Sequence, residues 1–213
     1  MSTIMAEKKP GVFTGPLWTN NPVVVQVLGI CSALAVTTQM KPALVMGIAL
    51  TCVLAFANVI ISLLRNTIPN RIRIIVQLVV VAALVIIVNQ ILKAYVYDVS
   101  KALSVYVGLI ITNCILMGRL EAFALGNKPW PALLDGLGNG LGYAGILFVV
   151  ATIREFFGAG TLFGFDVIAR FVNEAGFDGY QNCGFFVMPS AALIILGCII
   201  WYLRAKNPEL QDK

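Results

Sequence analysis

Residues 42–65 read PALVMGIALTCVLAFANVIISLLR, and residues 131–154 read PALLDGLGNGLGYAGILFVVATIR. The two stretches align without a gap and share Pro, Ala, Leu, Gly, Ala and a final Arg. Six matches in 24 positions are weak evidence alone, since apolar helices often match by chance. However, each copy follows an apolar segment that is short or interrupted, and precedes a full-length one. The pattern predicts two three-helix repeats, and an odd number of spans forces the second repeat to insert upside down.

The composition is typical of a protein that crosses the membrane several times. Of the 213 residues, 59% are hydrophobic and 12% are charged, and the mean hydropathy is +0.90. A soluble domain of this length needs far more charge to cover its surface. The net charge of +5 is typical of loop lysines and arginines that set membrane orientation, so we expect no nucleic-acid partner. The N-terminal residues contain no apolar core after their lysines, so we expect no signal peptide.

Charge-free runs predict four complete transmembrane helices. The first run, 42–64, has 23 residues, which correspond to about 34 Å of helix. The other three lie at 74–92, at 136–153 and within 179–203, where the strongly apolar part begins at Phe185.

Two further segments do not fit plain membrane-spanning helices. Residues 23–36 would make about 21 Å of helix, against a hydrocarbon core of roughly 30 Å. Pro22 predicts that this helix begins there, because proline fits the first helical turn. Residues 102–118 contain the polar run Thr112-Asn113-Cys114, where a lipid-facing helix should be most apolar. We expect both to be broken or half-length helices shielded by other protein, as is typical of internal sites.

These segments predict an all-α integral membrane protein with six transmembrane segments as two inverted three-helix repeats. We expect a cytoplasmic N-terminal segment at 1–21, a first repeat at 22–98, a second repeat at 99–204 and a cytoplasmic tail at 205–213. The positive-inside bias places both termini in the cytoplasm, because ten basic loop residues share their side and five lie opposite. The ten are Lys8, Lys9, Arg65, Arg71, Arg73, Arg119, Lys128, Arg204, Lys206 and Lys213, and the five are Lys41, Lys93, Lys101, Arg154 and Arg170.

The chain has five cysteines and no histidine. The lack of histidine excludes imidazole-ligated haem, Rieske clusters, most zinc sites and His-based catalytic triads. Cys52, Cys183 and Cys198 are expected to be small apolar packing residues. Cys31 and Cys114 are different, because they are the only pair placed equivalently in the two repeats, each on a broken helix.

Two thiolates that a pseudo-two-fold axis brings together indicate a metal centre. Without histidine, soft sulfur ligands favour an iron–sulfur cluster or another thiolate-bound metal. A [2Fe–2S] cluster needs four ligands, and this pair offers two, Cys31 and Cys114. The other two must come from a second chain, which is either another copy or a related protein.

The remaining polar residues of the apolar segments have plainer interpretations. Arg119 and Glu121 are expected to anchor a helix end at the membrane interface, and Asp135 and the pair Arg154-Glu155 to mark the ends of the fifth span. No acidic residue within a span offers an evident cation site, which disfavours a complete ion pump. Five glycines are expected to allow close helix packing, namely Gly136, Gly138, Gly140, Gly142 and Gly145. Four side-chain amides are expected to form interhelical hydrogen bonds, namely those of Asn58, Gln77, Asn89 and Gln90.

Five stretches together closely resemble the family of the D subunit of the bacterial Na⁺-translocating NADH:quinone oxidoreductase (Nqr), a family shared with the E subunit of the Rnf complex. They are NNPVVVQVLGICSALAVT (20–37), RNTIPNRIRIIVQ (65–77), GLIITNCILMGRLEAFA (108–124), DGLGNGLGY (135–143) and REFFGAGTLFG (154–164). The resemblance covers nearly the whole chain. In the Rnf member a proline is expected just after the first cysteine, whereas Ser32 follows Cys31 here.

The resemblance implies that Cys31 and Cys114 are ligands of an intramembrane [2Fe–2S] cluster, completed by the homologous E subunit in opposite orientation. It implies one subunit of a translocase in the bacterial inner membrane, not catalytic alone, that relays electrons between flavin-bearing subunits. NADH, flavins and quinone would bind the other subunits, A, B, C and F. Two alternatives stay open: an inverted-repeat transporter or channel without a redox role, and a scaffold subunit.

Overall fold

The fold is that of a computed structural model, which describes residues 21–69, 71–95, 108–158, 160–162, 165–166 and 184–206. The predictions for the two terminal segments and for Cys183 lie outside these residues. The long helices are α3 (Met40–Leu64), α4 (Arg73–Tyr95), α7 (Pro129–Gly158) and α9 (Pro189–Lys206). The short elements are α2 (Ile30–Val36), α6 (Cys114–Arg119), the π-helix η1 (Leu120–Ala124), the 3₁₀-helix η2 (Gly184–Val187) and the strands β1 (Thr161–Leu162) and β2 (Phe165–Asp166).

The described part is therefore almost wholly helical, as the composition predicts. Three of its helices are long and apolar enough to cross a membrane, at Met40–Leu64, Arg73–Ile91 and Pro129–Gly158. The fourth predicted span corresponds to α9, which is apolar but shorter, with 18 residues. The exception to the helical structure is one antiparallel ribbon, in which the two-residue strands β1 and β2 pair.

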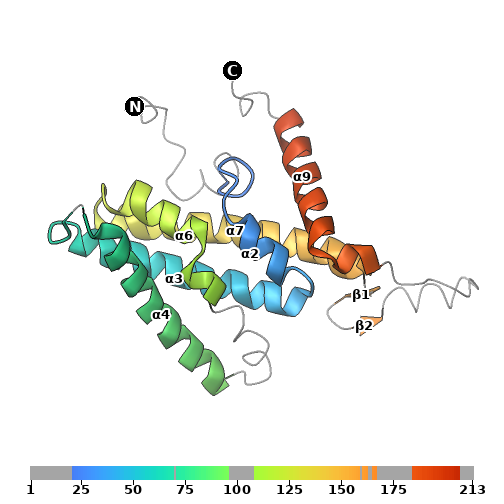
Figure 1. Cartoon of the computed structure of the whole chain (residues 1–213), viewed down its shortest axis with the longest axis horizontal. Coiled ribbons are helices and arrows are strands. Elements are labelled where there is room, and N and C mark those ends of the chain that lie inside the picture. Colours follow the sequence, from blue (N-terminus) through green and yellow to red (C-terminus); the bar gives the residue numbers. More distant parts are fainter. Residues whose placement is uncertain are drawn as a thin grey trace, which may run out of the picture.

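The centre of the fold is the antiparallel pair of α3 and α7, which run side by side (Figure 1). Small residues let their backbones approach closely, since a Cβ added to Gly140 would lie 2.8 Å from the Cα of Thr51. A Cβ added to Gly136 would likewise lie 2.9 Å from the Cα of Ala55. The prediction that this glycine-rich stretch serves close helix packing is confirmed at these two positions.

The contacts between α3 and α7 are reciprocal with respect to the sequence repeat. Gly47 packs against Ala144, and Ala55 packs against Gly136. The alignment matches Gly47 with Gly136 and Ala55 with Ala144. Exchanging the two repeats therefore converts the contact of Gly47 with Ala144 into the contact of Gly136 with Ala55. At the centre lie Thr51 and Gly140, which are matched with each other. In keeping with this exchange, α4 diverges from one end of the pair and α9 from the other (Figure 1).

The first apolar segment forms only a seven-residue helix, α2. The prediction that a helix begins at Pro22 is wrong. The Asn21 side chain accepts hydrogen bonds from the amides of Val23 and Val24, at 3.0 and 3.4 Å, and so closes one isolated turn. The chain then passes through positive φ values at Val27 (55°) and Gly29 (80°), which an α-helix cannot contain. The prediction of a half-length helix is confirmed.

The segment around the second candidate cysteine is also broken, as predicted. Residues 108–111 are helical, the helix stops at Thr112 and Asn113, and α6 begins at Cys114. Asn113 causes the restart, because its backbone is extended (φ −68°, ψ 123°) and its side chain accepts a hydrogen bond from the amide of Ile115. A polar residue that an uninterrupted helix would have exposed to lipid thus caps a new helix.

Helix α7 is longer than predicted and has 30 residues. Asp135, Arg154 and Glu155 therefore lie within it and are buried, with exposed fractions of 2%, 1% and 5%. The helix therefore continues beyond the residues that were predicted to bracket the fifth span. Each has a buried polar partner, which the charge pattern of the sequence does not indicate.

Candidate functional site

The two candidate cysteines meet where the broken helices meet. Cys31 lies in the first turn of α2 and Cys114 is the first residue of α6. Their segments meet although 83 positions separate the two cysteines, since the backbone amide of Gly29, two residues before Cys31, lies 2.8 Å from the Sγ atom of Cys114. The fold thus brings together the two segments that carry the candidate cysteines, and the role of these cysteines as ligands stays a prediction.

Gly29 brings the backbone of one segment to the sulfur of the other. Its amide donates a hydrogen bond to the Sγ atom of Cys114 at 2.8 Å. A Cβ at this position would lie 2.5 Å from Cδ1 of Ile115 and 3.0 Å from Cε2 of Tyr143, and the φ of 80° is unfavourable for other residues. Both the conformation and the space therefore require glycine just before α2.

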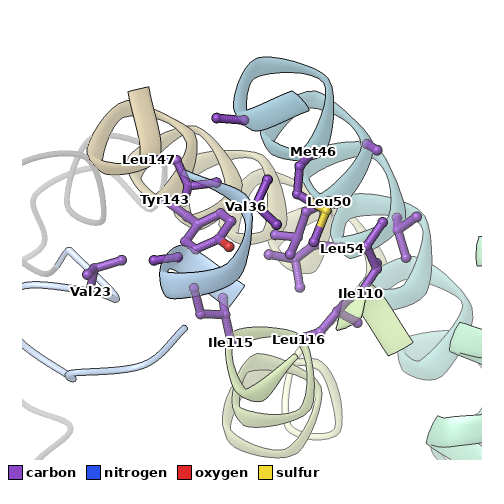
Figure 2. Close-up of a cluster of buried hydrophobic side chains, with 14 of the residues drawn as sticks. Val23, Val36, Met46, Leu50, Leu54, Ile110, Ile115, Leu116, Tyr143 and Leu147 are labelled. Atoms are coloured by element: carbon purple, nitrogen blue, oxygen red, sulfur yellow. The ribbon is translucent and has the colours of Figure 1, made fainter. Parts of the chain in front are cut away.

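A buried polar network lies directly behind the cysteines. The Asn113 side-chain amide donates to Oγ of Ser32 at 3.1 Å, and the hydroxyl of Tyr143 lies 2.6 Å from the same Oγ. All three residues have an exposed fraction of 0%. Figure 2 shows the ring of Tyr143 reaching from α7 toward α2, with Ile115 of α6 on the other side. The sequence pattern does not indicate this network, although Ser32 and Asn113 are chain neighbours of the two cysteines.

The thiols are accessible from outside this chain. Cys31 is exposed and Cys114 is half-buried, so another molecule can approach both. Among the described residues, no group of three or more His, Cys, Asp or Glu side chains is placed to hold a metal ion. Within the ranges that the structure covers, this chain thus brings two cysteines to one place and leaves both of them accessible.

The remaining described cysteines differ from the prediction in one respect. Cys52 on α3 and Cys198 on α9 are both exposed, so they do not fill gaps in the core of this chain. They face outward from long apolar helices, where a small apolar side chain fits against lipid or another protein chain.

A buried ion pair connects α6 to α7. The Nε atom of Arg119 donates to Oδ2 of Asp135 at 3.0 Å, and the NH2 group of the same guanidinium contacts the other carboxylate oxygen. The side chain of Asn139 also donates to this carboxylate, at 3.0 Å. Arg119 therefore does not simply reach toward the membrane interface. It ties the short helix that carries Cys114 to the central pair.

Glu121 on η1 connects to the neighbouring long helix α4. Its carboxylate contacts the guanidinium of Arg73 and accepts a hydrogen bond from the side chain of Gln77 at 3.2 Å. Another predicted amide, Asn58 of α3, donates to the backbone oxygen of Ala132 in α7 at 3.0 Å. The prediction of interhelical hydrogen bonds is confirmed for Gln77 and Asn58.

Arg154 of α7 binds the C-terminal end of α2. Its guanidinium donates to the Leu34 carbonyl (3.2 Å) and the Thr37 hydroxyl (2.6 Å) at the end of α2. It also donates to three carbonyls that lead into α9, those of Phe186, Val187 and Met188, at 3.1, 2.7 and 3.2 Å. The adjacent Glu155 accepts a hydrogen bond from the amide of Met40 at 2.6 Å and so caps α3. The helix that carries Cys31 is therefore held at both of its ends.

Comparison with known proteins shows the family of this chain. Residues 11–200 match the family described as Rnf-Nqr subunit, membrane protein. The chain is 56% identical over 194 residues, 91% of each chain, to the D subunit of the Na(+)-translocating NADH-quinone reductase of Aeromonas hydrophila. It is 53% identical over 96% of each chain to the protein of the same name from Shewanella halifaxensis, and 52% identical over 93% of each chain to that of Pseudoalteromonas atlantica. The chain belongs to the Rnf-Nqr family of membrane subunits.

Proposed function

We propose that this chain is a membrane subunit of a bacterial Na⁺-translocating NADH:quinone reductase and that it supplies two ligands, Cys31 and Cys114, to a shared [2Fe–2S] cluster. The names of its relatives support the first part, since identities of 52–56% over more than nine-tenths of both chains favour the same role. The observation that carries the second part is the meeting of two broken helices with accessible cysteines, where the Gly29 amide beside Cys31 donates to the Sγ atom of Cys114 at 2.8 Å.

The residues at the site fit an iron–sulfur cluster. Thiolates are the usual protein ligands of such clusters, and hydrogen bonds to the sulfurs adjust the reduction potential. The Gly29 amide already donates such a bond to Cys114, at 2.8 Å. When bound, the cluster would accept and pass on single electrons in the relay across the membrane. The role of this chain is to hold two sulfurs at fixed positions and to donate the Gly29 hydrogen bond.

The missing half of the site determines the partner. Four ligands are needed and two are present, so a second chain must offer two more thiolates to the exposed side of Cys31. The homologous E subunit in opposite orientation is the partner that we propose, because a related fold would present an equivalent pair of broken helices. The other Nqr subunits (A, B, C and F) would bind NADH, flavins and quinone.

We further propose that the fold is a six-span inverted repeat in the inner membrane with both termini cytoplasmic. The reciprocal contacts Gly47–Ala144 and Ala55–Gly136 support a two-fold axis that passes near Thr51 and Gly140. An axis in the membrane plane relates the two halves of such repeats. The same axis would exchange α2 with α6 and so place the two cysteines together.

The test is made in the purified complex with the substitutions Cys31→Ala and Cys114→Ala. We expect each variant to lose the iron of this cluster and its reduced EPR signal, and to lower NADH-driven quinone reduction by at least about 10²-fold, because one ligand is missing. Cys52→Ala and Cys198→Ala are matched controls on exposed cysteines of the long helices and should leave all three measurements unchanged.

Two results would contradict the proposal. Unchanged iron content and EPR signal in both ligand variants would show that the thiols only pack. Stable iron bound to this chain purified without its partners would show that the site is not shared. A transporter without a redox role would instead retain substrate flux when reconstituted alone.

A further inference from the structure

The buried hydrogen-bond network of Ser32, Asn113 and Tyr143 includes the residue next to each cysteine. Ser32 directly follows Cys31, and Asn113 directly precedes Cys114. The hydrogen bond of 3.1 Å from Asn113 to Ser32 therefore joins the two segments that carry the sulfurs, at a sequence separation of 81 positions. The spacing of the two thiols depends on this bond, because each thiol is one residue away from it.

Tyr143 attaches this junction to the central helix pair. Its hydroxyl lies 2.6 Å from Oγ of Ser32, and its ring packs beside Gly29 from the rigid helix α7 (Figure 2). The Ser32 hydroxyl donates its single proton to the Gly29 carbonyl at 3.0 Å. Ser32 must therefore accept from both Asn113 and Tyr143, so that the phenol is the donor.

The series of bonds ends at a sulfur. Ser32 holds the carbonyl of Gly29, and the amide of the same residue donates to Sγ of Cys114. A displacement of Ser32 would thus change both the position of Cys31 and the direction of the bond to Cys114. Tyr143 itself need not touch either sulfur to influence them.

We propose that Tyr143, acting through Ser32 and Asn113, is a positioning residue that fixes the two sulfur ligands and adjusts the reduction potential of the cluster they share. This inference rests on the proposed function. A hydrogen bond to a ligand sulfur stabilises the reduced, more negative state and raises the potential. A variant that no longer holds Gly29 in place should weaken the hydrogen bond from its amide to Cys114 and therefore lower the reduction potential. A phenylalanine would fill the same space against Ile115 and Gly29, so packing alone does not require the hydroxyl.

The experiment compares Tyr143→Phe and Ser32→Ala in the purified complex, with iron analysis, EPR of the reduced cluster and a potentiometric titration. We expect both variants to retain iron, to show a lower midpoint potential and to have a broadened EPR signal. Tyr202→Phe, at an exposed tyrosine of α9, and Ser62→Ala, at a serine bonded to the Asn127 carbonyl, are the matched controls and should equal the wild type.

The possible results separate the hypotheses. Loss of iron while the chain stays in the complex would also support the inference, since the sulfurs would no longer be held in place. Wild-type potential and EPR signal in both variants would overturn it. Loss of the chain from the complex in both variants would overturn it as well, because the hydroxyl would then serve folding only. If Cys31→Ala and Cys114→Ala retain the iron, the proposed function itself fails, whatever Tyr143→Phe shows.

Discussion

At the scale of single residues, the ion pair of Arg119 with Asp135 gives a prediction about stability. Asp135 is nearly fully buried, so removing its partner leaves a charge without compensation inside the protein. We expect Arg119→Gln or Asp135→Asn alone to destabilise the protein by about 3–5 kcal/mol, and the double variant by clearly less than the sum. The measurement is the temperature at which the complex loses this chain. Additive effects would show that the two side chains are not coupled.

Residues that the sequence predicted correctly are those whose chemistry depends on local spacing. The polar run at Asn113 predicted a broken helix, which the structure has, although the role of Asn113 as a helix cap was not predicted. The partners of Tyr143 and Arg154 could not be predicted in this way, because they are far away in sequence and only tertiary packing brings them together. The one local signal that was missed is Gly29, a glycine placed just before a candidate ligand.

At the scale of elements, α2 is too short to be stable alone and depends on its attachments. Seven residues make about two turns, whereas isolated helices in water need roughly 12–15 residues or more. Tyr143 and Asn113 hold it near its start, and Arg154 holds its end. Hydropathy located the long apolar helices but underestimated the length of α7. It could not locate the start of α2, which the backbone conformation at Val27 and Gly29 decides.

The attachment by Arg154 can be tested directly. Arg154→Met removes all five hydrogen bonds and leaves buried carbonyls unpaired, so we expect a loss of about 3–5 kcal/mol in stability and easier proteolysis near α2 and α9. Arg154→Lys should recover part of this loss, because it keeps the charge but offers fewer donors. Arg65→Met is the matched control, since Arg65 occupies the same position of the sequence repeat in a turn. Equal sensitivity of the two arginine variants would contradict the assigned role.

At the scale of the whole molecule, the segments that carry Cys31 and Cys114 lie together because the two repeats of the chain face each other. The α3–α7 pair is the rigid centre, and α2 and α6 lie against it together (Figure 1). The repeat in the sequence identifies the two matched helices, but not that they pack against each other or how closely. The glycines at positions 47, 136 and 140 allow the two helices to pack closely, because an added Cβ at each would lie within 3 Å of the opposite helix.

Adding one methyl group at the contact of α3 with α7 should therefore lower the stability of the whole fold. In Gly140→Ala the new Cβ would lie 2.8 Å from the Cα of Thr51, and backbone cannot yield as a flexible side chain does. We expect a loss of about 1–3 kcal/mol, seen as earlier thermal loss of the chain from the complex. Gly47→Ala and Gly136→Ala should both destabilise the pair, the second more strongly. The new Cβ at position 47 would lie 2.9 Å from the Cβ of Ala144, whereas that at position 136 would lie 2.9 Å from both the Cα of Ala55 and Nδ2 of Asn58. Gly145→Ala, whose Cβ would meet nothing within 4 Å, is the control. Stability equal to that of Gly145→Ala in both the Gly47→Ala and the Gly136→Ala variant would contradict the close packing of α3 against α7.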